Sequence, residues 1–163
     1  MNTQFESDLL REESCHDRLQ ALVLDHCGQK TEAHPGIVYS LIKAQPRNWW
    51  WEASQDTLIE VDGQDVNLWL WLCDSGRFGV HFEIPEADFW AIDPDHVVSQ
   101  EAREYTRLCG DVPGILPLAT VSWEDAWLAV AYLYKETKPT PRLQWKEQSE
   151  LASMYGVEFV MES

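Results

Sequence analysis

Basic residues are scarce in this sequence. Its 12 Lys and Arg stand against 28 Asp and Glu, which gives a formal net charge of −16 at pH 7. A charge of this sign and size disfavours nucleic acid or an anionic membrane as a direct partner, because both repel carboxylates. The charge is compatible with a basic protein partner, with a metal site, or with solubility alone. We therefore expect no nucleic acid and no membrane among the partners.

Long apolar runs are missing as well. No stretch approaches the ~20 consecutive apolar residues that a membrane-spanning helix needs. Residues 1–10 carry acids and no apolar run, so we expect no signal peptide. Without a secretory signal, scattered cysteines are expected to be reduced and mostly buried, and the protein to be cytoplasmic. The cysteines are Cys15, Cys27, Cys73 and Cys109.

The sequence also lacks the usual motifs of catalysis and cofactor binding. Cys15-His16 and Asp25-His26-Cys27 collect metal-ligand types, but their spacing matches no compact zinc pattern. There is no Gly-x-Ser-x-Gly elbow and no Gly-rich phosphate loop. His81 and Glu83 would point the same way on a strand, and a surface pair is the simpler interpretation. We expect no metal, no cofactor and no enzymatic activity.

The apolar content suits one folded domain. Of the 163 residues, 45% are hydrophobic and nine are tryptophan, which is enough material for a single core. No linker or internal repeat divides the chain. We predict one domain over residues 1–163, in which residues 1–13 form a flexible arm.

Helical spacing of apolar residues occurs toward both ends of the chain. Ser14 and Asp17 resemble a capping box and Gly28 a helix stop, so a first helix is predicted between Ser14 and Gly28. Ser122 is the expected N-cap of the clearest helix, whose first turn is acidic. Further helices are predicted over residues 36–45, 98–109 and 148–155.

A two-residue period replaces the helical one in the middle of the chain. Short turns at residues 62–65 and 74–76 carry hairpin chemistry, which favours an antiparallel meander. Residues 85–95 are expected to be an acidic loop. Together the patterns predict an α+β fold, an antiparallel β-meander sheet with helices packed on it. The predicted strands cover residues 48–53, 57–62, 66–73, 77–84 and 142–146.

The strand from Asn67 to Cys73 is apolar on both sides. Its leucines point one way, and Trp69 and Trp71 point the other. Aligning the neighbouring strands places carboxylates beside the two tryptophans, and a buried core rarely collects carboxylates. We therefore predict that this second face binds a partner. The predicted contact residues are Glu60, Asp62, Trp69, Trp71, Glu83, Glu86 and Asp88.

A series of recognisable motifs runs from residue 116 to residue 146. It consists of Leu116-Pro117-Leu118, a helix with Ala126 and Ala129-Val130, the turn Lys138-Pro139-Thr140-Pro141, and the strand Leu143-Gln144-Trp145. This series resembles the C-terminal part of the first-numbered immunity family of bacterial polymorphic toxin systems. The resemblance implies a small α+β cytoplasmic protein that binds and blocks a cognate toxin, often a deaminase or nuclease. It carries over no catalytic residues.

The favoured hypothesis is thus an immunity protein that neutralises a toxin with a basic surface. Toxins that act on nucleic acid tend to be basic near the substrate site, so an acidic inhibitor is physically sensible. Two alternatives stay open. An acidic mimic of nucleic acid that inhibits a defence enzyme predicts phosphate-like carboxylate spacing on an exposed ridge with little tryptophan. A glycan-acting enzyme predicts a concave pocket with two carboxylates and a tryptophan platform.

Overall fold

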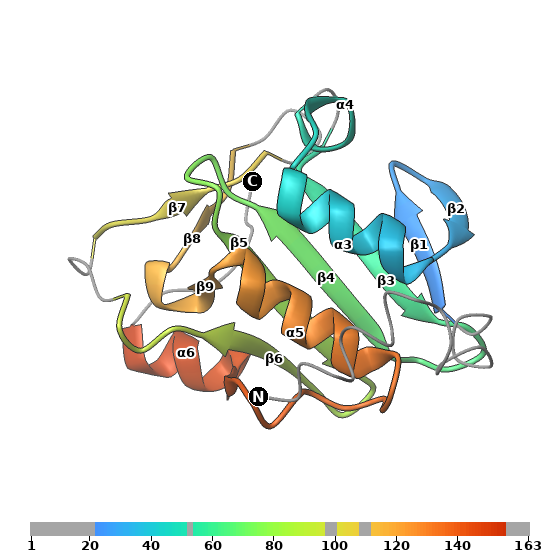
Figure 1. Cartoon of the computed structure of the whole chain (residues 1–163). Helices are drawn as coiled ribbons and strands as arrows, with labels where there is room; N and C mark the ends of the chain where they lie inside the picture. Colours follow the sequence, from blue (N-terminus) through green and yellow to red (C-terminus); the bar gives the residue numbers. More distant parts are fainter. Residues whose placement is uncertain (1–21, 52–53, 97–100, 108–111, 156–163) are drawn as a thin grey trace.

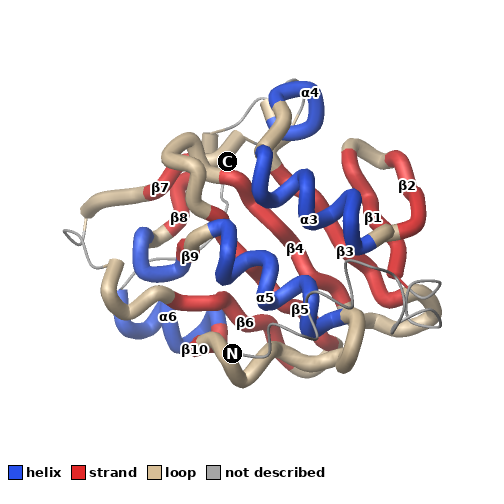
Figure 2. The backbone as a smooth tube through the Cα atoms, viewed as in Figure 1, coloured by secondary structure: helices blue, strands red, loops and turns tan. Residues whose placement is uncertain are grey.

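The protein has an α+β fold, as the sequence patterns predict. The computed structural model describes residues 22–51, 54–96, 101–107 and 112–155. Its main sheet has eight antiparallel strands in the order β10-β6-β5-β4-β3-β1-β2, with β9 paired to β5. Strands β7 and β8 form a second, two-stranded sheet. Helices α3 and α5 lie side by side on one face of the main sheet, and α6 lies beside β6 (Figures 1 and 2).

The strand bounds confirm the central meander. Strands β3, β4 and β5 lie where the two-residue period predicted them, and β10 is the expected return strand. The strands are β1 Leu22–His26, β2 Gln29–Glu32, β3 Asp56–Val61, β4 Asn67–Leu72, β5 Phe78–Ile84, β6 Ala87–Ile92, β7 Glu104–Tyr105, β8 Gly114–Ile115, β9 Thr120–Val121 and β10 Gln144–Glu147.

Three of the helices also match the prediction. Ser122 caps α5, because its hydroxyl accepts a hydrogen bond from the backbone N–H of Asp125 at 3.2 Å. Pro35 occupies the first turn of α3, where its missing N–H costs no hydrogen bond. The helices are α3 Pro35–Ala44, α4 Arg47–Trp50, α5 Trp123–Leu133, α6 Gln148–Tyr155 and a 3₁₀ turn η1, Pro117–Ala119.

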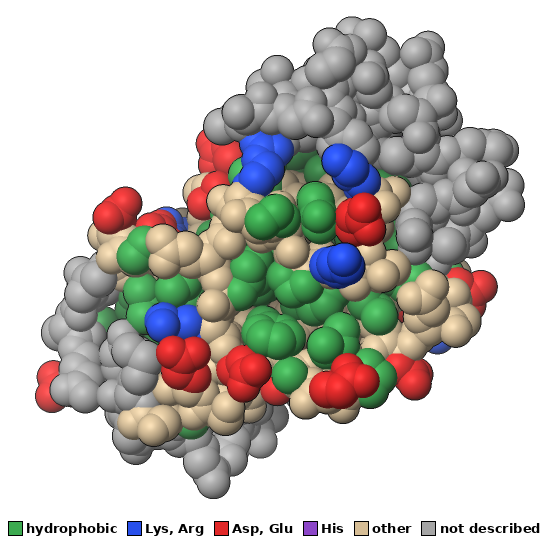
Figure 3. Space-filling view, turned by 90° about the horizontal axis from the view of Figure 1, so that it is seen from below, with side chains coloured by type: hydrophobic (Ala, Val, Ile, Leu, Met, Phe, Trp, Pro, Cys, Tyr) green, Lys and Arg blue, Asp and Glu red, His purple; other side chains and the backbone are tan. Residues whose placement is uncertain are grey.

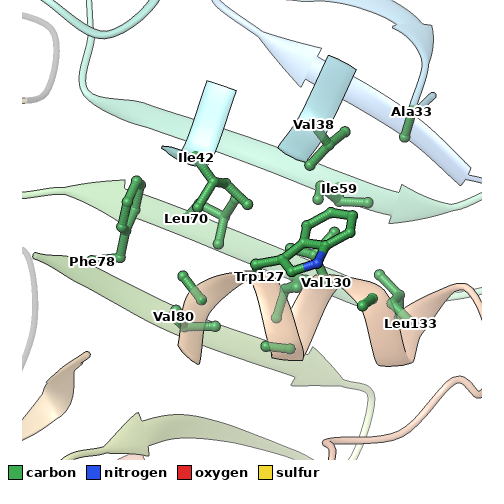
Figure 4. Packing of buried hydrophobic residues seen from close by; sticks show 14 of the residues in the cluster. Ala33, Val38, Ile42, Ile59, Leu70, Phe78, Val80, Trp127, Val130 and Leu133 are labelled. Atoms are coloured by element: carbon green, nitrogen blue, oxygen red, sulfur yellow. The ribbon is translucent and has the colours of Figure 1, made fainter. Parts of the chain in front are cut away.

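The predicted core face is confirmed. Side chains of β3, β4 and β5 meet α3 and α5 in one cluster, where Leu70 and Phe78 are at most 1% exposed (Figure 4). Trp127 and Val130 of α5 lie over these strands. At about 25 cal/mol per Å² of apolar area removed from water, this layer is the main source of stability.

The first predicted helix is wrong where the structure describes it. Leu22–His26 forms strand β1, and the polar segment after it forms β2. Cys27 and Gly28 join the two strands with φ angles of 53° and 80°, the positive values that a two-residue I′ turn requires. Gly28 therefore turns a hairpin instead of ending a helix. The start of the predicted helix, with Ser14 and Asp17, and the arm 1–13 lie outside the described residues.

Three other expectations also fail. Residues 48–53 were expected as a strand, but Arg47–Trp50 form α4, and the indole of Trp50 donates to the carbonyl of Leu41 at 2.9 Å. The expected acidic loop 85–95 contains strand β6, because Pro85 and Glu86 make a tight turn after β5. In the described part of the segment 98–109 there is no helix, and Glu104–Tyr105 pairs with β8.

None of the helices in the described parts of the chain is long and apolar enough to cross a lipid bilayer.

Candidate functional site

The sheet face opposite α3 and α5 carries five of the seven predicted contact residues, and we call it the second face. Strand register aligns its side chains in rows that run across the strands. The aromatic row contains Asp25, Leu58, Trp69, His81 and Trp90. The carboxylate row contains Glu60, Asn67, Glu83 and Asp88. The register therefore places Glu60 and Glu83 on one face, as the strand alignment predicts, and adds Asp88 from β6, which was expected in a loop.

Part of the second face is covered by segments that come later in the chain. A second apolar cluster joins the sheet to β8, η1 and α6. Gly79 makes this packing possible, because a Cβ there would lie 2.9 Å from Ile115 Cδ1 and 3.1 Å from Trp90 Cζ3. The cluster comprises Trp71, Cys73, Trp90, Ile115, Leu116, Ala119 and Leu151.

This covering buries one of the two tryptophans that were predicted as contacts and leaves the other partly exposed. The rings of Trp69 and Trp71 stack with centroids 5.2 Å apart. Trp71 is only 4% exposed, whereas Trp69 is partly exposed at the border of the cluster. A partner on the second face can therefore touch Trp69, but the Trp71 ring contributes through packing and not through direct contact.

Each acid of the carboxylate row already binds a neighbouring side chain. Glu60 Oε2 accepts from Lys30 Nζ at 3.0 Å. Glu83 Oε1 accepts from the indole N–H of Trp69. The side chains of Glu60 and Asp88 are 28% and 41% exposed, so both remain accessible to solvent. Because a carboxylate offers about four lone-pair sites, each acid can still accept from a partner.

His81 lies in the middle of the second face and is buried, with 7% of its surface exposed. Its ring stacks on Trp90 at 4.6 Å, and its Nε2 lies 3.1 Å from Asp88 Oδ2. The expected surface pair with Glu83 is thus replaced by a buried contact with Asp88, because β6 follows β5 directly. Burial lowers the pKa of His81, although the hydrogen bond with Asp88 opposes that change.

The two remaining predicted contacts are turn residues. Asp62 follows β3, Glu86 follows β5, and both are exposed. Because Asn67 at the start of β4 pairs with Glu83 near the end of β5, both turns lie at the end of the sheet that holds the carboxylate row. The acids of the predicted set therefore share one region of the surface.

A hollow of about 560 Å³ opens on the second face near β1 and β3. It holds two carboxylates that the sequence prediction missed, Asp25 and Asp56. The missed signal for Asp25 was the two-residue spacing of the buried Leu22 and Leu24, which the helix prediction obscured. The lining residues are Asp25, Cys27, Gly28, Ser54, Asp56, Leu58 and Trp69.

The view from the side of β6 and α6 shows how polar and apolar groups are distributed. Hydrophobic side chains gather in the middle of this view, and Asp and Glu side chains line its lower margin (Figure 3). Lys and Arg side chains lie among the hydrophobic ones in the same view.

The described ranges hold no group of three or more His, Cys, Asp or Glu side chains that could bind a metal ion. Cys73 is buried, and burial raises the pKa of its thiol to about 12, so it is a poor ligand and nucleophile. Cys27 is exposed, so one of the two described thiols departs from the expected burial. Cys15 and Cys109 lie outside the described residues.

No protein-family model matches the chain, and no curated protein matches its sequence.

Proposed function

We propose that this protein is an immunity protein that binds a cognate bacterial toxin in the cytoplasm and neutralises it. The observation that carries the proposal is the accessible carboxylate row beside the partly exposed Trp69. Aromatic anchors next to acidic groups are typical of surfaces that bind basic proteins. The resemblance of residues 116–146 to an immunity family supports the same proposal independently.

The overall charge supports a basic partner. A net charge of −16 attracts a positively charged protein over about a Debye length and speeds its association. Deaminases and nucleases need a positive surface to hold nucleic acid, so a toxin of this kind is the partner that we propose. The site needs no catalytic residue for this function, because occupying the toxin surface is enough to block it.

The nucleic-acid-mimic alternative has less support. A mimic needs carboxylates that replace phosphates at regular spacing, with few other groups in contact. In the carboxylate row Asn67 separates Glu60 from Glu83, and Trp69 donates to Glu83. The row is therefore irregular, and it is mixed with an aromatic side chain.

A glycan-acting enzyme is the second candidate, and the hollow favours it. Asp25 and Asp56 with Trp69 have the composition that such a site needs. If this function is correct, the purified protein will release reducing sugars from a glycan, and an Asp25→Asn/Asp56→Asn variant will not. The immunity function predicts no release by either protein.

A survival assay tests the proposed function. The immunity function predicts that a gene beside the one for this protein encodes the toxin domain, and that domain is induced in bacteria with or without this chain. We expect wild-type chain to restore growth and Glu83→Lys to restore it less, because a reversed charge repels a basic surface.

The matched control is Glu136→Lys, which makes the same charge change at an exposed position after α5, away from the second face. It should protect as well as wild type. Growth arrest in the presence of abundant, folded wild-type chain would contradict the proposed function.

A further inference from the structure

The hollow on the second face has a chemical character that the carboxylate row does not share. Its floor contains Leu58, which is 8% exposed, and one wall contains Trp69. Two carboxylates, Asp25 and Asp56, line the same space. None of the described lining residues is Lys or Arg. The hollow therefore combines an apolar floor, an aromatic wall and negative charge.

The register places the two carboxylates across Leu58. Asp25 on β1 pairs directly with Leu58 on β3, and Asp56 precedes Leu58 by two residues on the same face. Such diagonal neighbours are about 7–8 Å apart between backbones. The hydroxyl of Ser54 donates to Asp56 Oδ1, which helps to orient this carboxylate. A flat cationic group between the two acids can bind both.

The base on the neighbouring strand does not occupy this position. Lys30 on β2 pairs with Asp25, but its ammonium binds Glu60 at 3.0 Å and its side chain is 59% exposed. Asp25 contributes less to raising the Lys30 pKa than Glu60 does. The ammonium group of Lys30 therefore pairs with Glu60 in the carboxylate row. The two carboxylates of the hollow keep their negative charge available for a ligand.

We propose that the hollow receives an arginine side chain of the protein partner; that the partner is a toxin rests on the function proposed above. A guanidinium group is planar, stacks on indole rings and donates paired hydrogen bonds to carboxylates, so it matches Trp69, Asp25 and Asp56 better than an ammonium does. A volume of about 560 Å³ exceeds one side chain and leaves room for the residues beside the arginine. The charge of −16 supplies the long-range attraction.

Titration of the whole chain with a short peptide tests this inference without the toxin. The probe is acetyl-Gly-Arg-Gly-amide in 150 mM salt, and the signal is the indole N–H resonance of Trp69, identified by its loss in a Trp69→Phe variant. We expect saturable binding with a dissociation constant on the order of 1 mM, as suits one anchored side chain. A citrulline peptide of equal shape and no charge should bind at least about tenfold more weakly.

Single substitutions test whether the peptide binds in the hollow. Asp25→Asn and Asp56→Asn should each weaken binding about fivefold or more, because each removes a charge-assisted hydrogen bond with little change in shape. Glu136→Gln removes one charge elsewhere and should leave the affinity unchanged. Lys30→Gln should strengthen binding, because it removes a positive charge that interacts with Asp25.

Three results would overturn the inference. They are no saturable shift of the Trp69 signal, equal binding of the arginine and citrulline peptides by wild-type protein, and a shift with cellotriose but not with the arginine peptide. The peptide comparison uses wild-type protein, so it does not depend on the folding of any variant. A negative result here, together with growth rescue in the survival assay, would reject the arginine site and leave the immunity function standing.

Discussion

Gly79 determines which part of the second face is covered and which part stays accessible. With no side chain of its own, it lets the ring of Trp90 and the end of Ile115 lie against β5. This packing buries Trp71 on one side and leaves Trp69 at the border on the other. The position of the proposed contact surface thus follows from a missing Cβ.

Replacing Gly79 by Ala should destabilise the protein by about 1–3 kcal/mol. The added Cβ would lie 3.1 Å from the rigid Trp90 ring, so side chains of the second cluster must shift. Urea unfolding followed by tryptophan fluorescence measures the change. Gly36→Ala is the control, since its Cβ would meet only His34 at 3.4 Å and Ala is a better helix former. Unchanged stability of the Gly79 variant would contradict this prediction, because the side chains of the second cluster would then accommodate the Cβ without a cost in free energy.

Residue-level prediction from the sequence succeeded where alternation alone decides burial. It predicted that Leu68 and Leu70 face the core and that Glu60 and Glu83 share the other face with Trp69. Asp88 joins this face because the expected loop is strand β6. The sequence could not predict the burial of Trp71, because the covering side chains come from β8, η1 and α6. The sequence of a strand does not indicate which distant segments pack against it.

Among the elements, α5 shows how local signals decide structure. Ser122 caps it, Glu124 and Asp125 occupy the first turn, and Trp127 with Val130 form the buried side. Capping and dipole effects favour a helix at this position before any tertiary contact forms. This agreement between local and tertiary signals is why the sequence predicted α5 correctly.

Replacing Ser122 by Ala should lower the free energy of unfolding by about 1 kcal/mol, because the backbone N–H of Asp125 loses its acceptor. Thermal or urea unfolding measures the loss. Ser40→Ala, at an exposed position inside α3, should leave stability unchanged or raise it slightly. Equal stability of the two variants would contradict the capping role of Ser122.

The hairpin of β1 and β2 shows the opposite case. Leu22, Val23 and His26 fit a helical spacing, while Leu22 and Leu24 fit a strand equally well. Pairing with β3 decides between them, because it buries Leu22 and Leu24 in the main core. Short apolar segments carry this ambiguity, and only long-range pairing removes it. The error concealed Asp25 and with it the hollow.

At the scale of the whole molecule, one face of the sheet builds stability and part of the other remains accessible. Helices α3 and α5 cover the core face, and β8, η1 and α6 cover only part of the second face. The accessible remainder carries Trp69, the carboxylate row and the hollow. A large negative charge then directs basic proteins toward this surface.

The most direct test of this account is calorimetric titration of this protein with the purified toxin domain that the proposed function expects a neighbouring gene to encode. We predict a tight complex that Glu83→Lys weakens about tenfold or more and that Trp69→Ala weakens by at least ~2 kcal/mol, since both change the accessible second face. Glu136→Lys should bind like wild type. Absence of binding, or equal affinities for all four proteins, would contradict the account.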